Sequence, residues 1–174
     1  AGIDKVEDID RLAGRIDRAK ARGIRIHYLA PYQHSALHAM SGLLKTAARR
    51  VAPGASRTLM EAVAVQRSVK SGVEVAEIEE ALGVTGQMHR ACMAAAKPGR
   101  RESELAAIIQ AVALSRDRQQ AFTPIVTVRG EVLHNHSYDG VLARGQLLLN
   151  DSGAESRRYY ASDITRTCPV GSRF

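Results

Sequence analysis

Two aspartates near the end of the 174-residue sequence, Asp151 and Asp163, have the residue type and spacing most suited to chemistry. Asp151 follows the apolar run 147–149 and precedes a Ser-Gly turn pair, and Asp163 precedes a β-branched run with alternating polar residues. This pattern predicts two strands joined by a short loop, with the aspartates close together. Two nearby carboxylates repel unless a proton or a cation lies between them. We therefore expect a divalent metal site; the alternative is a polar hairpin whose aspartates only cap turns.

The sequence around these aspartates resembles a known family. The segments are Asn-Asp-Ser-Gly-Ala-Glu at 150–155 and Tyr-Ala-Ser-Asp-Ile-Thr-Arg-Thr-Cys-Pro-Val at 160–170. They resemble the metal-binding signature of the pita-bread metallopeptidases, which include creatinase and methionine aminopeptidase, and most of all the Xaa-Pro aminopeptidase and prolidase branch. The resemblance implies that Asp151 is the first metal ligand and Asp163 the second, bridging ligand. The sequence departs from the family pattern at Asn150 and Ser152, where an apolar residue and alanine are usual.

The His134-Asn135-His136 triplet is the second candidate site. The run 122–128 is rich in β-formers, residues 129–131 favour a turn, and residues 132–136 are expected to form a strand with both imidazoles on one face. A pair of metal-binding histidines would leave the aspartates unexplained, and three letters are too few to identify a His-Asn-His nuclease. By resemblance, the pattern Ile-Val-x-x-x-Gly-x-x-Leu-His makes His134 the catalytic residue that contacts the substrate. His136 is expected to line the same pocket or to support it.

The resemblance also implies an activity, that of a metal-dependent Xaa-Pro aminopeptidase or dipeptidase, which hydrolyses the Xaa-Pro bond and removes the residue that precedes proline. The expected substrate is a peptide with proline at the second position, and the expected cofactors are two divalent ions, manganese or else cobalt or zinc. The family completes its site with one histidine and two glutamates, and the sequence after Asp163 contains neither residue type. We therefore expect an internal fragment of a longer enzyme. Alone it should be inactive, and it should associate with itself or with a complementing C-terminal half.

The rest of the sequence predicts the elements that would support this site. Apolar periodicity predicts helices over residues 3–22, 32–50, 56–69, 71–97 and 102–118, and a strand over Ile24–Leu29. Ser71 and Glu74 have the spacing of a capping box at the start of a long helix. We predict a mixed α/β (α+β) fold. By resemblance, residues 1–55 are the tail of a small α/β creatinase-like N-terminal domain, and residues 56–174 are the first half of a pita-bread catalytic domain.

Composition limits the other classes of function. The net charge of +7 suits an anionic partner, but the basic residues are spread along the chain and aromatic residues make up only 4% of it. We therefore do not expect nucleic acid, and no apolar run is long enough to expect a membrane span. The two cysteines favour reduced thiols in a cytoplasmic protein. The competing function is a nonenzymatic, basic pita-bread module that binds protein or nucleic acid, although such relatives typically lose the carboxylates that this sequence keeps.

Overall fold

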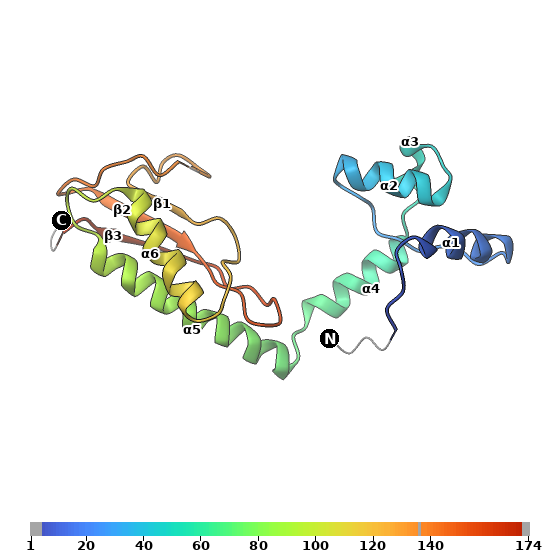
Figure 1. The fold of residues 1–174 in the computed structure, drawn as a ribbon, viewed down its shortest axis with the longest axis horizontal. Coiled ribbons are helices and arrows are strands. Elements are labelled where there is room, and N and C mark those ends of the chain that lie inside the picture. Colours follow the sequence, from blue (N-terminus) through green and yellow to red (C-terminus); the bar gives the residue numbers. More distant parts are fainter. Residues whose placement is uncertain (1–4, 136, 172–174) are drawn as a thin grey trace. The chain divides into compact units, whose positions relative to one another are not determined.

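The computed structural model describes residues 5–135 and 137–171 (Figure 1). The chain divides into two compact units, Ala1–Val69 and Lys70–Phe174. The first contains helices α1 (Arg11–Ala21), α2 (His34–Leu44), α3 (Ala48–Val51) and α4 (Arg57–Ser68). The second contains helices α5 (Gly72–Ala95) and α6 (Glu102–Ser115) and strands β1 (Ile125–Thr127), β2 (Leu147–Ser152) and β3 (Ile164–Pro169).

The segment Ile24–Leu29 of the first unit is not a strand, contrary to the prediction from its alternating pattern. A strand needs a neighbour for its backbone hydrogen bonds, and the described part of the chain offers none at this segment. The segment is held instead through Tyr28. Its carbonyl oxygen accepts a hydrogen bond from the Ser56 N–H at 3.0 Å, and its hydroxyl donates to the Val51 carbonyl oxygen at 2.9 Å.

The predicted helix ends agree with the structure better in the second unit than in the first. The helix predicted from residue 3 begins at Arg11, because Asp8 accepts a hydrogen bond from the Asp10 N–H at 3.1 Å and so favours a local turn; residues 3 and 4 lie outside the described part. The helix predicted over 32–50 is interrupted at Lys45, which has a φ of 50°. Helix α5 begins as predicted, with a capping box between Ser71 and Glu74.

Helices α5 and α6 of the second unit pack against an antiparallel sheet of strand order β1-β2-β3 (Figure 1). Their shared core contains the buried side chains Met88, Cys92, Leu105, Ile109, Val126 and Leu148. Burying an aliphatic side chain of this size contributes about 1.5–3 kcal/mol. Along β2 every second residue is buried, while Leu147, Leu149 and Asp151 retain exposed surface. The core contacts therefore fix which face of the strand presents Asp151.

The division between the two units falls after Val69, not after residue 55 as the sequence suggested. Helix α4 groups with the first unit although it buries none of its residues. The assignment of residues 1–55 to a creatinase-like domain remains a prediction. None of the helices in the described part of the chain is both long and apolar enough to cross a membrane.

Candidate active site

Strands β2 and β3 bring Asp151 and Asp163 together. In their antiparallel register Asp151 lies opposite Thr165, and Ser152 lies opposite Ile164, the residue that follows Asp163. The Thr165 hydroxyl donates to Asp151 Oδ1 at 2.7 Å. Desolvation raises the pKa of Asp163 above its ordinary value, and the charge of Asp151 and a side-chain hydrogen bond with it raise it further. The strand register and the raised pKa of Asp163 both place the two carboxyl groups near each other.

Gly153 allows the segments that carry the aspartates to touch. A Cβ atom at Gly153 would lie 1.7 Å from the Ser162 carbonyl oxygen and 3.2 Å from the Asp163 nitrogen. Thr85 of α5 lies beside this contact, where its Oγ1 accepts a hydrogen bond from the Ala154 N–H at 2.9 Å and lies 2.7 Å from Ser162 Oγ. The Ser162 N–H donates to the Ala154 carbonyl oxygen at 3.0 Å. Backbone contact and buried hydrogen bonds therefore both fix the approach of Asp163 to Asp151.

Asn150 and Ser152, the two departures from the family pattern, have partners inside the unit. Asn150 Nδ2 lies 3.2 Å from His89 Nδ1, and Ser152 Oγ lies 3.3 Å from His89 Nε2. The Ser152 carbonyl oxygen lies 3.4 Å from the same Nε2. When the Asn150 amide donates to Nδ1, a neutral imidazole carries its proton on Nε2 and donates it to Ser152. All three residues are buried, so the polar residues beside Asp151 join β2 to α5.

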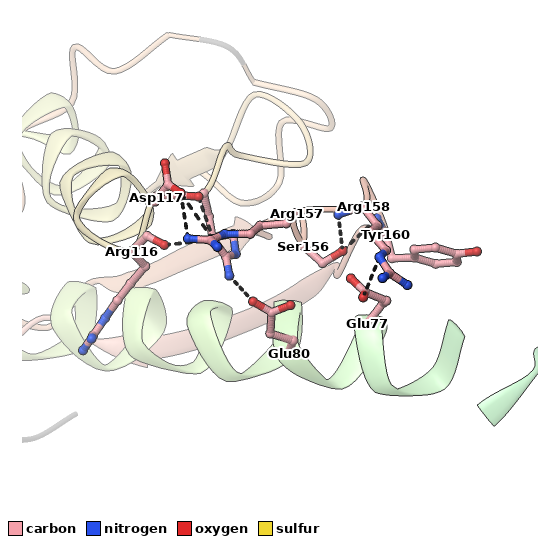
Figure 2. Close-up of polar contacts among 9 residues, drawn as sticks. Glu77, Glu80, Arg116, Asp117, Ser156, Arg157, Arg158 and Tyr160 are labelled. Carbon is pink, nitrogen blue, oxygen red and sulfur yellow. Dashed lines mark hydrogen bonds and ion pairs between the residues drawn. The ribbon is translucent and has the colours of Figure 1, made fainter. Parts of the chain in front are cut away.

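Charged side chains hold the connection between β2 and β3 (Figure 2). Arg158 Nε lies 3.5 Å from Glu77 Oε1 on α5, and Arg157 Nη2 lies 3.0 Å from Asp117 Oδ2, just after α6. Both arginines are about 70% exposed. The Arg157–Asp117 pair is exposed on both sides and contributes only about 0–1 kcal/mol, whereas the Glu77 side chain is only 17% exposed. The strand register therefore depends more on the Gly153 contact and the buried hydrogen bonds than on these ion pairs.

His134 does not lie on a strand, and the strand predicted over residues 132–136 is wrong for the described residues. The Val132 N–H donates to the Arg129 carbonyl oxygen at 3.0 Å, which closes a turn. His134 has a φ of 54°, in the left-handed region, where a β-strand cannot continue. Its side chain is exposed and, among the described residues, forms no hydrogen bond with either aspartate. His136 lies outside the described residues.

The two carboxylates suit a divalent cation but do not complete a site for one. Carboxylate oxygens are preferred ligands of hard divalent cations. Within residues 5–135 and 137–171 neither aspartate has a basic ion-pair partner, so no positively charged side chain offsets their repulsion. The same residues contain no group of three or more His, Cys, Asp and Glu side chains that could hold a metal ion. The described residues thus bring two carboxylates together, and a metal-ligating role for Asp151 and Asp163 remains a prediction.

The model of metallopeptidase family M24 matches residues 76–174. The chain belongs to this family. A probable Xaa-Pro aminopeptidase of Uncinocarpus reesii is 38% identical over 124 residues, which make up 67% of this chain and 26% of that relative. A probable Xaa-Pro aminopeptidase of Chaetomium globosum is 30% identical over 176 residues and matches 99% of this chain, but only 28% of its own length. This M24 chain thus spans about a quarter of the length of the curated relatives it matches.

Solved structures show the fold of this M24 chain. The prolidase from Pyrococcus furiosus superposes with a TM-score of 0.59 at 30% identity, covering 64% of this chain and 34% of that one. The X-Pro aminopeptidase from Thermotoga maritima covers 97% of this chain and 46% of its own, with a TM-score of 0.71 at 21% identity. The second likeness concerns the fold alone. The chain has part of the pita-bread fold.

Proposed function

We propose that the chain is part of a dinuclear-metal aminopeptidase that hydrolyses the bond between an N-terminal residue and a following proline. The observation that carries this proposal is the close approach of Asp151 and Asp163 in a chain of a metallopeptidase family. The names of the relatives, Xaa-Pro aminopeptidase and prolidase, support a peptide with proline at its second position as the substrate.

In this proposal each candidate residue has one role. Asp151 and Asp163 would hold the metal ions through their carboxylate oxygens, as the first and the second ligand. Bound ions of this kind polarise the scissile carbonyl and lower the pKa of bound water. His134 contacts the substrate and stabilises the charge that develops on the scissile carbonyl oxygen, and His136 belongs to the substrate pocket. Manganese is the proposed metal, with cobalt or zinc as alternatives, and the proposed location is the cytoplasm.

We also propose that the chain alone neither holds two metal ions tightly nor cleaves peptides. Two neighbouring carboxylates without a third ligand bind a hard cation weakly, and no larger group occurs among the described residues. Strand β3 lies at an edge of the described sheet. An open strand edge beside an incomplete site favours association, either with a second copy or with a complementing C-terminal half.

The test compares the full-length gene product with the 174-residue chain. The full-length protein should release the N-terminal residue of an Xaa-Pro peptide, lose this activity with a chelator and regain it with Mn²⁺. Asp151→Asn and Asp163→Asn should each lower the metal content and the activity. Calorimetry should show weak Mn²⁺ binding by the chain alone. Binding of a peptide without cleavage by the metal-loaded full-length protein would favour the nonenzymatic module and contradict the proposal.

The role of His134 has a separate test in the full-length protein. His134→Ala should lower turnover by about 10²-fold, since it removes one hydrogen bond that strengthens in the transition state. Its metal content should stay that of the wild type. The matched control is His38→Ala, which changes an exposed histidine in the other unit and should alter neither quantity. A loss of metal in His134→Ala would make His134 a ligand and overturn its assignment.

A further inference from the structure

A buried glutamate joins the two ends of the loop that carries His134. Glu102, the first residue of α6, is only 2% exposed. Its Oε1 accepts a hydrogen bond from the Val128 N–H at 2.7 Å, and its Oε2 accepts one from the Gly140 N–H at 3.1 Å. Val128 precedes and Gly140 follows the loop 129–139. A single carboxylate thus closes the loop at its base, although it lies far from the loop in the sequence.

Thr127 extends this network to the residue next to His134. Its hydroxyl donates to Glu102 Oε1 at 3.0 Å and accepts hydrogen bonds from the Asn135 side-chain amide at 3.2 Å and from the Arg129 N–H at 3.0 Å. A hydroxyl has one donor and two acceptor lone pairs, so all three hydrogen-bonding positions of the Thr127 hydroxyl are occupied. Thr127 is 1% exposed, and water therefore cannot replace these contacts without a rearrangement.

The packing around the carboxylate leaves no room for another side chain. A Cβ atom at Gly140 would lie 2.5 Å from Glu102 Oε1 and 2.8 Å from Oε2. The Glu102 N–H donates in turn to the Gly140 carbonyl oxygen at 3.0 Å. Gly140 and Glu102 therefore form a closed pair of backbone and side-chain hydrogen bonds, and only glycine permits it.

We propose that Glu102 and Thr127 are positioning residues for His134. They fix the loop 129–139 so that the exposed imidazole is presented to the peptide, and they touch neither the substrate nor a metal. The importance of this for catalysis rests on the function proposed above, but the network itself does not depend on that function. The alternative is that Glu102 only favours the N-terminus of α6 through its charge. In that case a substitution of Glu102 would alter α6 and leave the loop unaffected.

The experiment measures amide hydrogen exchange by NMR on the 174-residue chain. In Glu102→Ala, exchange at Val128 and Gly140 should be about tenfold faster or more, since hydrogen bonds to a charged acceptor are lost. Glu102→Gln, which keeps one carbonyl acceptor, should restore part of the protection. Thr127→Val keeps the shape of the side chain and the carboxylate, and it should speed up exchange at Arg129 while Val128 keeps its carboxylate acceptor. Amides in the middle of α6 should keep their wild-type exchange rates in the Gln and Val variants.

Tryptic cleavage after Arg129 is the second measurement, because this exposed residue lies in the loop. Cleavage should be faster in Glu102→Gln and Thr127→Val than in the wild type. The matched controls are Glu79→Gln and Thr123→Val, which change exposed residues and should leave both measurements unchanged. Glu102→Gln and Thr127→Val test the proposal even where Glu102→Ala does not fold. Unchanged loop exchange and cleavage in both variants, or faster exchange confined to α6, would overturn it.

A kinetic measurement on the full-length gene product separates this inference from the proposed function. Thr127→Val should lower kcat more than it raises KM, with unchanged metal content, because a displaced imidazole is no longer aligned with the reacting carbonyl. Equal kcat in the variant and the wild type would overturn the positioning role. Absence of Xaa-Pro hydrolysis in the metal-loaded wild type would instead contradict the proposed function, and the exchange and cleavage results on the chain would still decide whether the network holds the loop.

Discussion

The aspartate pair and His134 are positioned by different kinds of structure. Asp151 and Asp163 lie at paired strands whose register is set by backbone hydrogen bonds and by the direct backbone contact at Gly153. His134 lies in an exposed turn that is closed by one backbone hydrogen bond, and the loop around it is held at its base mainly through the Glu102 side chain. A site held by the backbone tolerates little local change, whereas a loop held by side chains can be loosened by one substitution without unfolding the sheet. The comparison therefore predicts large stability effects at the strands and functional effects at the loop.

The strongest test of this comparison is Gly153→Ala. The new methyl group would meet a backbone carbonyl, which cannot move without displacing Asp163. We expect a loss of about 3 kcal/mol in the free energy of unfolding, at the upper end for overpacking, measured by urea denaturation of the chain. Gly83→Ala is the matched control in α5, since its Cβ would meet nothing within 4 Å; it should stabilise the helix by about 0.5–1 kcal/mol. Equal stability of Gly153→Ala and the wild type would refute the backbone account.

The sequence predicted the strands near the aspartates better than the loop that carries His134. Turn residues and alternation predicted two strands within residues 147–155 and 159–170, where β2 and β3 lie, and the capping box marked the start of α5, because these signals are local in the chain. The strand predicted over residues 132–136 failed for the opposite reason. Alternation over five residues also fits a turn, and the contacts that decide between them come from Glu102 and Thr127. Ile24–Leu29 failed as well, since alternation does not supply a neighbouring strand.

The partner of Asn150 and Ser152 was also missed, although the sequence contained a signal for it. The two polar residues occupy buried positions of β2, on the same face as Leu148. A buried polar group needs a hydrogen-bonding partner, so a polar side chain had to face them. His89 on α5 is that partner. Which residue it would be could not be derived from the sequence, because the pairing depends on how α5 packs on the sheet.

A smaller effect is expected when this link between α5 and β2 is removed. His89→Ala leaves the Asn150 amide and the Ser152 hydroxyl without a partner, and should lower the free energy of unfolding by about 2 kcal/mol. Arg90→Ala, which changes the exposed neighbour of His89, is the control and should stay within about 0.5 kcal/mol of the wild type. Asn150→Val should cost less in the His89→Ala background than in the wild type. Strictly additive costs would show that the two side chains do not interact.

The last prediction concerns the ionisation of Cys92, which lies in the core between α5 and the sheet. Its effect on the free energy of unfolding is expected to be smallest at neutral pH and to grow as the pH rises. Burial, with a contribution from nearby Cys168, raises the pKa of the Cys92 thiol to about 12. The unfolded chain ionises its thiols near the ordinary value of about 8.5. The folded state therefore favours the protonated thiol, and this stabilisation is complete below the unfolded pKa and is lost as the pH rises toward 12.

The measurement is the free energy of unfolding of the wild type and of Cys92→Ala between neutral pH and about pH 10.5. Above the unfolded pKa the wild type should lose stability more steeply, by up to about 1.4 kcal/mol per pH unit, and the difference between the two slopes cancels the ionisation of other groups. At mildly alkaline pH iodoacetamide should modify the half-buried Cys168 before the fully buried Cys92. Equal slopes, or equally fast modification of both thiols in the folded chain, would show that the packing beneath the aspartate strands does not protect the Cys92 thiol from solvent.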